Sequence, residues 1–532
     1  MRAWLVWLAV ACLAALPAAA ALDLAAVSKL ATGDSDERIA AIAAFVASGE
    51  PRAVIVLQAL ADGEVQVAAG RVLVVRGEEG EDAATGQRVA PLPADRDEVV
   101  VNNRLRGELD SALAALRLLS PEREQRLAAA RELSGGAREA MLPLVKRALA
   151  SESDPAIRPI LEMTAAGIEI KAAGKATRLA AIRTLSGSSN PAMKTLLLPL
   201  VERRKDGGFA EADDDVRIAA QSALSAIETR LAWGQRAGLL FSGISLGSIL
   251  LLAALGLAIT YGLMGVINMA HGELIMIGAY TTYVVQNLFR LHLPAAFDAY
   301  LLLAVPASFV ASALVGMALE RLVIRHLYGR PLETLLATWG LSLILIQGVR
   351  TIFGAQNVQV ENPSFMSGGV ELFTGIVMPW SRIVIIAFAV AVLAGVGLLL
   401  RRTRLGLFVR GVTQNRAMAA CVGVPTSRVD RWAFGLGSGI AGLAGCALSQ
   451  IGNVGPDLGQ SYIVDSFMVV VLGGVGQLAG TVLAAMGLGL VNKLLESWSG
   501  AVLAKIAVLV FIILFIQKRP QGLFALKGRA VD

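Results

Sequence analysis

Residues 238–263, with the sequence GLLFSGISLGSILLLAALGLAITYGL, form a long apolar run without one charged residue. About 20 apolar residues in a helix are enough to cross the hydrocarbon core of a bilayer. Further apolar stretches follow at 266–289, 300–319, 335–353, 383–400, 432–451, 462–491 and 502–516. The sequence therefore predicts an all-α fold whose residues 231–532 form a polytopic membrane helix bundle.

The composition agrees with a membrane protein. Hydrophobic residues make up 55% of the chain and charged residues 17%, whereas soluble domains have about 25% charged residues. This balance excludes a disordered chain, a fibrous protein and an ordinary cytosolic enzyme. Three cysteines and three histidines are too few for a disulfide framework or a typical metal site, so we expect no metal and no cofactor.

The net charge of +6 is unevenly distributed. Residues 231–532 contain 20 Lys+Arg and 11 Asp+Glu, and residues 22–230 contain 27 and 31. The basic residues of the apolar half gather in 321–330, in 401–431 and after residue 516, whereas 354–379 has none. By the positive-inside rule, the three basic segments face the cytoplasm. The excess of basic residues thus indicates membrane topology and contact with lipid. It does not indicate binding of nucleic acid.

This topology requires the stretch 461–491 to cross the membrane region twice. The run GGVGQLAG interrupts it at residues 473–480. Non-helical backbone at membrane depth is tolerated where protein or a water-filled path satisfies it. We therefore predict broken or re-entrant helices here. The expected hinge residues are Gly473, Gly474, Gly476 and Gly480.

The first 230 residues have a different organisation. Arg2, an apolar run to Leu16 and small residues after Pro17 predict a signal peptide over 1–21. Residues 22–230 contain the related phrases RIAAI at 38, RLAAA at 126, RLAAI at 178 and RIAAQ at 217. Turns and second apolar segments follow the first three, which is typical of stacked helix pairs of the HEAT type. We expect an extracytoplasmic α-helical repeat domain, with a β-hairpin or extended insertion at 72–75 and 99–101.

Polar residues inside the predicted bundle are candidates for a solute path, because ionisable groups in lipid usually face a cavity or a partner. For Asn268, His271 and Glu273, lining a path and capping helix ends are equally open interpretations. For Thr338 and Ser342, contact between helices is the favoured role. For Asp465, a place at the outer mouth of the path and a structural role both stay open. The candidates are Asn268, His271, Glu273, Thr338, Ser342 and Asp465.

Several motifs of the apolar half resemble one known family. NMAHGE at 268–273, VTQNRAMAACVG at 412–423, VLGGVG at 471–476 and RPQGLF at 519–524 resemble the branched-chain amino acid (LivH-like) ABC permease family. The segment SQIGNVGP at 449–456 and the exported domain look more like its urea-transporting, UrtB-type branch. The resemblance covers about 238–525. It implies that the chain is a multi-pass inner-membrane permease subunit of an ATP-driven importer and is not itself an enzyme.

The resemblance also implies partners and a substrate. These are a second permease subunit, two cytoplasmic ABC ATPase subunits and an extracytoplasmic solute-binding protein. A helix over 414–422 in the loop 401–431, ended by Gly423 and Pro425, would be the ATPase-coupling element. Urea is the expected solute, with branched-chain amino acids or short-chain amides as the alternative and a passive urea channel as a second alternative. The implied coupling residues are Arg410, Gln414, Asn415, Arg416 and Gly423.

Overall fold

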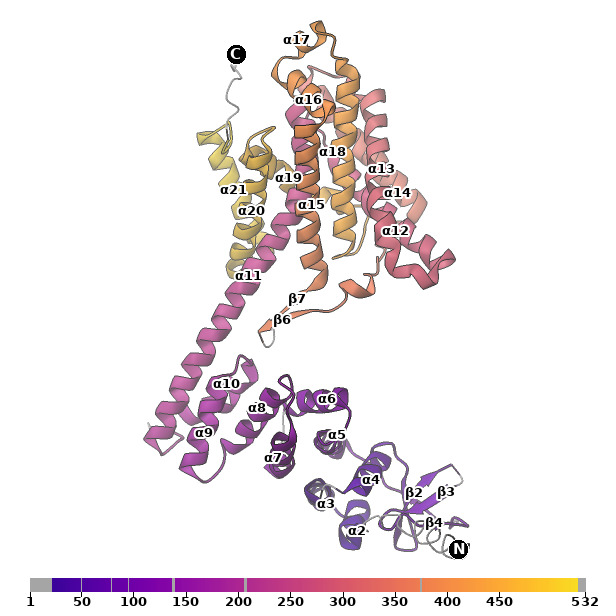
Figure 1. Cartoon of the computed structure of the whole chain (residues 1–532), viewed down its shortest axis with the longest axis vertical. Coiled ribbons are helices and arrows are strands. Elements are labelled where there is room, and N and C mark those ends of the chain that lie inside the picture. The colour runs from indigo at the N-terminus through magenta and orange to yellow at the C-terminus, as the bar shows by residue number, and fades with distance from the viewer. Residues whose placement is uncertain are drawn as a thin grey trace, which may run out of the picture. The chain divides into compact units, whose positions relative to one another are not determined.

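The computed structural model describes residues 22–524, except 49, 78, 94, 136–138, 205–207 and 374–375. The predicted signal peptide lies outside the described residues. The chain divides between Leu231 and Ala232 into two compact units. Each unit has its own hydrophobic cores and is mostly helical, as the sequence predicts (Figure 1).

The N-terminal unit is built from helix pairs. The phrases that begin at Arg38, Arg126 and Arg178 lie in the first helices of the pairs α3–α4, α6–α7 and α9–α10, so the prediction of paired helices is confirmed. Assignment to the HEAT class stays a prediction. The helices are α2 (Leu24–Thr32), α3 (Ser35–Ser48), α4 (Pro51–Ala61), α5 (Asn103–Arg117), α6 (Arg123–Leu133), α7 (Leu142–Ser151), α8 (Arg158–Glu169), α9 (Lys175–Ser186) and α10 (Pro191–Val201).

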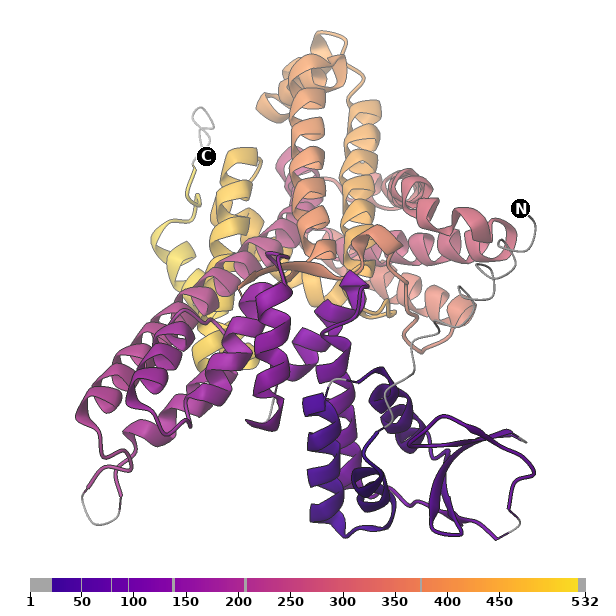
Figure 2. The same ribbon diagram turned by 60° about the horizontal axis from the view of Figure 1, so that its bottom comes forward.

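An antiparallel sheet lies beside the first of these helices (Figure 2). Its order is β4-β3-β2-β1-β5, and β2 contains the predicted extended segment 72–75. The partner of β2 is β1 and not 99–101, because Ala69 and Gly70, both with positive φ, form a tight two-residue hairpin turn. The strands are β1 (Val65–Ala68), β2 (Arg71–Arg76), β3 (Glu79–Asp82), β4 (Arg88–Val89) and β5 (Asp97–Glu98).

The second unit is a helix bundle. Among the described residues, seven helices are long and apolar enough to cross a membrane. Helix α12 and the shorter α19 complete the bundle. Its long helices are α11 (Asp214–Met264), which begins in the first unit, α12 (His271–His292), α13 (Tyr300–Leu322), α14 (Pro331–Phe353), α15 (Trp380–Arg402), α18 (Thr426–Ser449), α19 (Leu458–Gly473), α20 (Leu478–Ser499) and α21 (Ala501–Lys518).

Two opposite ends of the bundle carry the shorter elements. Helices α16 (Arg404–Gln414) and α17 (Arg416–Cys421) lie at one end (Figure 1). The hairpin of β6 (Gly369–Phe373) and β7 (Ile376–Pro379) lies at the other end. Short 3₁₀ segments in this unit lie at Pro294–Ala299, Ile324–His326 and Ser364–Met366, and one in the first unit lies at Glu139–Met141.

Helix α18 occupies the centre of the bundle and is buried over most of its length. A Cβ atom on Gly437 would overlap α11 at Gly256, and one on Gly442 would overlap α13 at Ser308. A Cβ atom on Gly445 would overlap the backbone of α12. Small residues let membrane helices approach closely, so the glycines of α18 place three neighbouring helices directly against it.

The predicted break in 461–491 is confirmed. Helix α19 ends at Gly473 and α20 begins at Leu478, while Gly474 and Gly476 have φ values of 96° and 79°. Glycine adopts such values without the steric cost of a side chain. The C-terminal segment packs on this turn, since the Leu523 N–H donates a 2.8 Å hydrogen bond to the Leu472 carbonyl.

Candidate functional site

The segment 265–270 between α11 and α12 carries the first predicted site residue. Gly265, with φ of 64°, follows the end of α11. The Asn268 Oδ1 atom accepts a 3.1 Å hydrogen bond from the Ala270 N–H. The Met269 N–H donates a 3.2 Å hydrogen bond to the Thr338 hydroxyl of α14. These bonds hold a short non-helical segment inside the bundle.

The first turn of α12 adds two buried ionisable side chains. The His271 Nε2 atom lies 2.9 Å from the Ala253 carbonyl of α11. The Ser342 hydroxyl of α14 donates a 2.6 Å hydrogen bond to Glu273 Oε1. The structure thus gathers Asn268, His271, Glu273, Thr338 and Ser342 around the start of α12, and we call these five residues the polar cluster. Both α14 residues bond to the segment 269–273, as expected of contacts between helices.

Three atoms of the polar cluster have no hydrogen-bond partner among the described residues: Asn268 Nδ2, His271 Nδ1 and Glu273 Oε2. Their side chains are at most 1% exposed. A buried polar atom without a partner is costly, so such an atom in a native protein needs an explanation, such as a bound water or ion, local strain or a functional role. The polar cluster therefore has unused donor and acceptor capacity for a polar group.

A cavity of about 150 Å³ adjoins the polar cluster at Asn268 and is partly open. The rings of Tyr261 and Phe467 lie in its wall with centroids 6.2 Å apart. These two residues are not among those predicted from the sequence, because an apolar side chain in a membrane helix gives no local signal that it faces a cavity. The lining residues are Leu257 and Tyr261 of α11, Ile267, Asn268 and Met269, and Ile463, Val464 and Phe467 of α19.

Asp465 lies outside the polar cluster. It is on α19, and its Oδ2 atom is 3.2 Å from Lys505 Nζ of α21. Its side chain is 14% exposed and does not line the cavity beside Asn268. The ion pair joins two helices, which favours the structural interpretation, and a role of Asp465 in the path stays a prediction.

The four predicted hinge glycines lie where chain segments touch. A Cβ atom on Gly473 would overlap the backbone of Gly480, and one on Gly262 of α11 would overlap Gly476. A Cβ atom on Gly474 would meet the C-terminal segment at Phe524. Close packing therefore requires glycine at 473, 474 and 480, and the positive φ of Gly476 favours glycine there. The role of the four glycines as a hinge stays a prediction.

The predicted coupling helix over 414–422 is wrong in its N-terminal boundary. Helix α16 ends at Gln414, and α17 begins at Arg416. The reason is Asn415, whose extended backbone and side chain cap α17 by accepting a 2.9 Å hydrogen bond from the Met418 N–H. Gly423, with φ of 87°, follows the helix as predicted.

The remaining coupling candidates differ in their surroundings. Arg410 and Gln414 are exposed on α16. Met418 and Val422 are also largely exposed, although their side chains are apolar. Arg416 is bound to Asp430 of α18 by two hydrogen bonds. The tip around α17 therefore combines exposed apolar side chains with one basic residue that is attached to the bundle.

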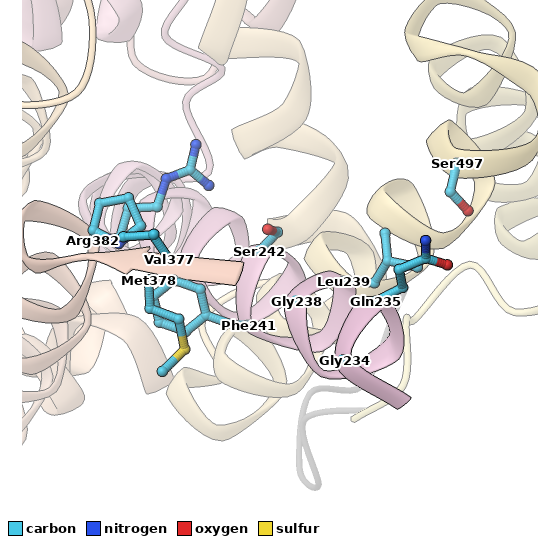
Figure 3. Close-up of a pocket in the computed structure, with 11 residues that line it drawn as sticks. Gly234, Gln235, Gly238, Leu239, Phe241, Ser242, Val377, Met378, Arg382 and Ser497 are labelled. Carbon is cyan, nitrogen blue, oxygen red and sulfur yellow. The ribbon is translucent and has the colours of Figure 1, made fainter. Parts of the chain in front are cut away.

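A larger cavity of about 640 Å³ lies elsewhere, among α11, β7, α15 and α20 (Figure 3). Figure 3 shows Phe241, Val377 and Met378 on one side of it and Gln235 and Ser497 on the other. Among the described residues, its lining includes none of the predicted site residues, and Arg382 is its one charged lining residue. The smaller cavity is the candidate site, because it adjoins buried polar atoms that lack partners.

Comparisons with known proteins agree with the motifs of the second unit. The model of the family described as "Branched-chain amino acid transport system / permease component" matches residues 239–517. The high-affinity branched-chain amino acid transport system permease protein BraD of Pseudomonas aeruginosa is 27% identical over 290 residues. That alignment covers 53% of this chain and 94% of BraD.

Other relatives have the same character. The permease protein LivH of Escherichia coli K12, of a high-affinity branched-chain amino acid transport system, is 29% identical over 292 residues, 53% of this chain and 94% of LivH. A probable LivH of Methanocaldococcus jannaschii is 26% identical over 302 residues, 54% of this chain and 91% of that protein. No solved structure matches the chain.

Proposed function

This chain belongs to the family of branched-chain amino acid transport permeases, and from that premise we propose that it forms the membrane path of an ATP-driven importer for amino acids with branched apolar side chains. The chain is a transport component and no enzyme, and ATP hydrolysis takes place on separate subunits. Urea, the solute expected from the sequence, is less well supported than this alternative, because these relatives are named for branched-chain amino acids.

The main structural support for this proposal is the cavity beside Asn268. Seven of its eight lining residues are aliphatic, aromatic or methionine, and the eighth supplies an amide. An isobutyl or sec-butyl side chain gains free energy when such walls remove it from water, at about 25 cal/mol per Å². Urea is polar on all its edges and would lose hydrogen bonds there. The Asn268 Nδ2 atom is buried beside the cavity and has no hydrogen-bond partner among the described residues, so a rotation of this amide would supply a donor for the carboxylate of an amino acid.

The segment that favoured urea also has a structural explanation. Ser449 donates a hydrogen bond to the Cys446 carbonyl within α18. Gln450 Oε1 lies 3.1 Å from the Tyr300 hydroxyl of α13. Neither residue lines the cavity beside Asn268. These side chains therefore join the end of α18 to α13, and their presence does not require urea as the solute.

The proposal assigns an orientation and partners to the bundle. The end with α16 and α17 faces the cytoplasm, in accord with the arginines of 401–431. Two ATPase subunits act there, and α17 contacts one of them. A second permease subunit completes the partly open path, and a binding protein delivers solute on the opposite side. The N-terminal unit is then extracytoplasmic.

Uptake by the complete importer tests this function. The importer with this chain is expressed in a host that lacks its own systems, and uptake of labelled leucine and of labelled urea is measured at equal concentrations. We expect ATP-dependent leucine uptake that excess isoleucine, but not excess urea, reduces. ATP-driven uptake of urea alone would identify a urea permease. Urea uptake that persists without the ATPases would identify a passive channel.

A matched pair of variants tests the cavity itself. Phe467→Ala removes part of the cavity wall and should lower leucine uptake about tenfold, since loss of apolar contacts in a substrate pocket costs about 1–3 kcal/mol. Phe511→Ala makes the same change on α21, where the ring is 55% exposed and lies away from the cavity. Equal uptake by the two variants would remove the cavity from the path.

A further inference from the structure

Three helices and one turn meet through charged and polar side chains next to α17. The participants come from α17, from the end of α13, from the turn after it and from the first turns of α18. We call this group the basal network. Its members are Glu320, Tyr328, Arg416, Asp430 and Arg431.

The strongest contact of the basal network joins α17 to α18. Both terminal nitrogens of Arg416 donate hydrogen bonds to the two carboxylate oxygens of Asp430. Asp430 is completely buried, whereas the Arg416 side chain is 44% exposed. A buried carboxylate that loses its cation is left at high cost, so this two-bond pair holds its geometry. It attaches the exposed tip to the central helix.

Tyr328 extends the network to α13. The guanidinium carbon of Arg416 lies 5.1 Å from the centroid of the Tyr328 ring. The Tyr328 hydroxyl donates a 3.0 Å hydrogen bond to Glu320 Oε1 near the end of α13. The same hydroxyl lies 3.3 Å from the sulfur of Met264 at the end of α11. One tyrosine thus connects the α17 arginine with two further membrane helices.

One contact of the network is not closed. Glu320 Oε2 and Arg431 Nε are 3.8 Å apart, and neither atom has a hydrogen-bond partner among the described residues. Both charges sit at the junction of α13 and α18. A shift of α18 against α13 by about 1 Å would bring the two atoms within hydrogen-bonding distance. The basal network therefore has one hydrogen-bonded ion pair, Arg416–Asp430, and one pair, Arg431–Glu320, that could become hydrogen-bonded when the helices move.

We propose that the basal network transmits movement of α17 to α18 and α13, with Arg416 as the positioning residue that attaches the tip to the bundle. This inference rests on the proposed function, in which an ATPase moves α17. Because α18 packs directly against α11, α12 and α13, a displacement at Asp430 reaches the helices around the polar cluster. Arg416 itself touches no solute in this scheme.

The test compares solute transported per ATP hydrolysed by the complete importer in lipid vesicles. Arg416→Gln should lower this ratio at least about tenfold, because the tip loses its charged attachment. Arg416→Lys keeps the charge but loses the two-bond geometry and should give an intermediate ratio. Arg428→Gln is the matched control, because Arg428 is exposed on the first turn of α18 and has no ion pair among the described residues.

A double variant separates transmission from folding. Arg416→Gln with Asp430→Asn removes the unpaired carboxylate at position 430, so the amount of folded complex should return to the level of the unchanged chain. The transport ratio should nevertheless stay low, because the attachment is still missing. Recovery of the ratio in the double variant would overturn the proposal. A ratio in Arg416→Gln equal to that in Arg428→Gln would overturn it as well.

The unchanged importer distinguishes this inference from the proposed function. If it contains no bound ATPase, or transports without ATP, the proposed function itself fails. If it couples leucine uptake to ATP and the Arg416 variants couple equally well, the function stands and only the transmission role is wrong.

Discussion

Replacing Gly423 by alanine isolates the backbone conformation at the end of α17. Gly423 has φ of 87°, and an added Cβ atom would meet no other atom within 4 Å. Alanine in this left-handed region costs about 1–2 kcal/mol, with no gain or loss of packing. The Gly423 N–H donates to the Ala420 carbonyl, and the Val424 N–H donates to the Ala419 carbonyl. The strain therefore weakens the last turn of α17.

Hydrogen exchange of the purified full chain measures this effect. A cost of 1–2 kcal/mol increases the population of the open form about 5–30-fold. Amides of residues 416–424 should exchange faster by that factor in Gly423→Ala. Gly423→Asn should show a smaller change, because asparagine tolerates the left-handed region better than alanine. In the importer, the loosened tip should also lower transport per ATP.

Gly411→Ala is the matched control on the neighbouring helix. Gly411 lies inside α16, its added Cβ atom would also meet nothing within 4 Å, and its φ is not positive. Alanine there favours the helix by about 0.5–1 kcal/mol, so exchange over 404–414 should become slower. Unchanged exchange of α17 in Gly423→Ala, or faster exchange of α16 in Gly411→Ala, would refute the argument from backbone conformation.

Three further predictions concern stability. The Arg126 guanidinium, through a 2.8 Å hydrogen bond, lowers the pKa of Glu152 below its usual 4.5, so its stabilisation is complete above about pH 4.5 and is lost as the pH falls through the folded pKa. Glu152→Gln should therefore speed hydrogen exchange around α6–α8 at pH 7, with a cost of about 1–2 kcal/mol that shrinks in acid. Lys505→Met should lower the unfolding temperature in detergent by leaving Asp465 unpaired, at a cost of about 2–3 kcal/mol, and Asp465→Asn should restore most of it. Gly442→Ala forces α13 away from α18 and should reduce the yield of folded chain seen by size-exclusion chromatography, at a cost of about 1–3 kcal/mol.

The positions of the long apolar helices and of their main interruption could be predicted from the sequence. A span is recognised from about 20 consecutive apolar residues, and the break at 473–480 from its glycines, so both are local properties. The helix pairs of the N-terminal unit were likewise visible as repeated phrases. Two local details were missed, namely the hairpin partner of β2 and the capping of α17 by Asn415. Each depends on a turn geometry that competes with a simple hydrophobic pattern.

Which of these residues contact one another became evident from the three-dimensional arrangement of the helices. Arg416 meets Asp430 and Tyr328, Asp465 meets Lys505, and Tyr261 meets Phe467 across large separations along the chain. Hydropathy identifies a helix as membrane-embedded but does not say which side faces lipid, a cavity or another helix. Those directions follow from close packing around the glycines of α18, where a single added methyl group would separate the helices.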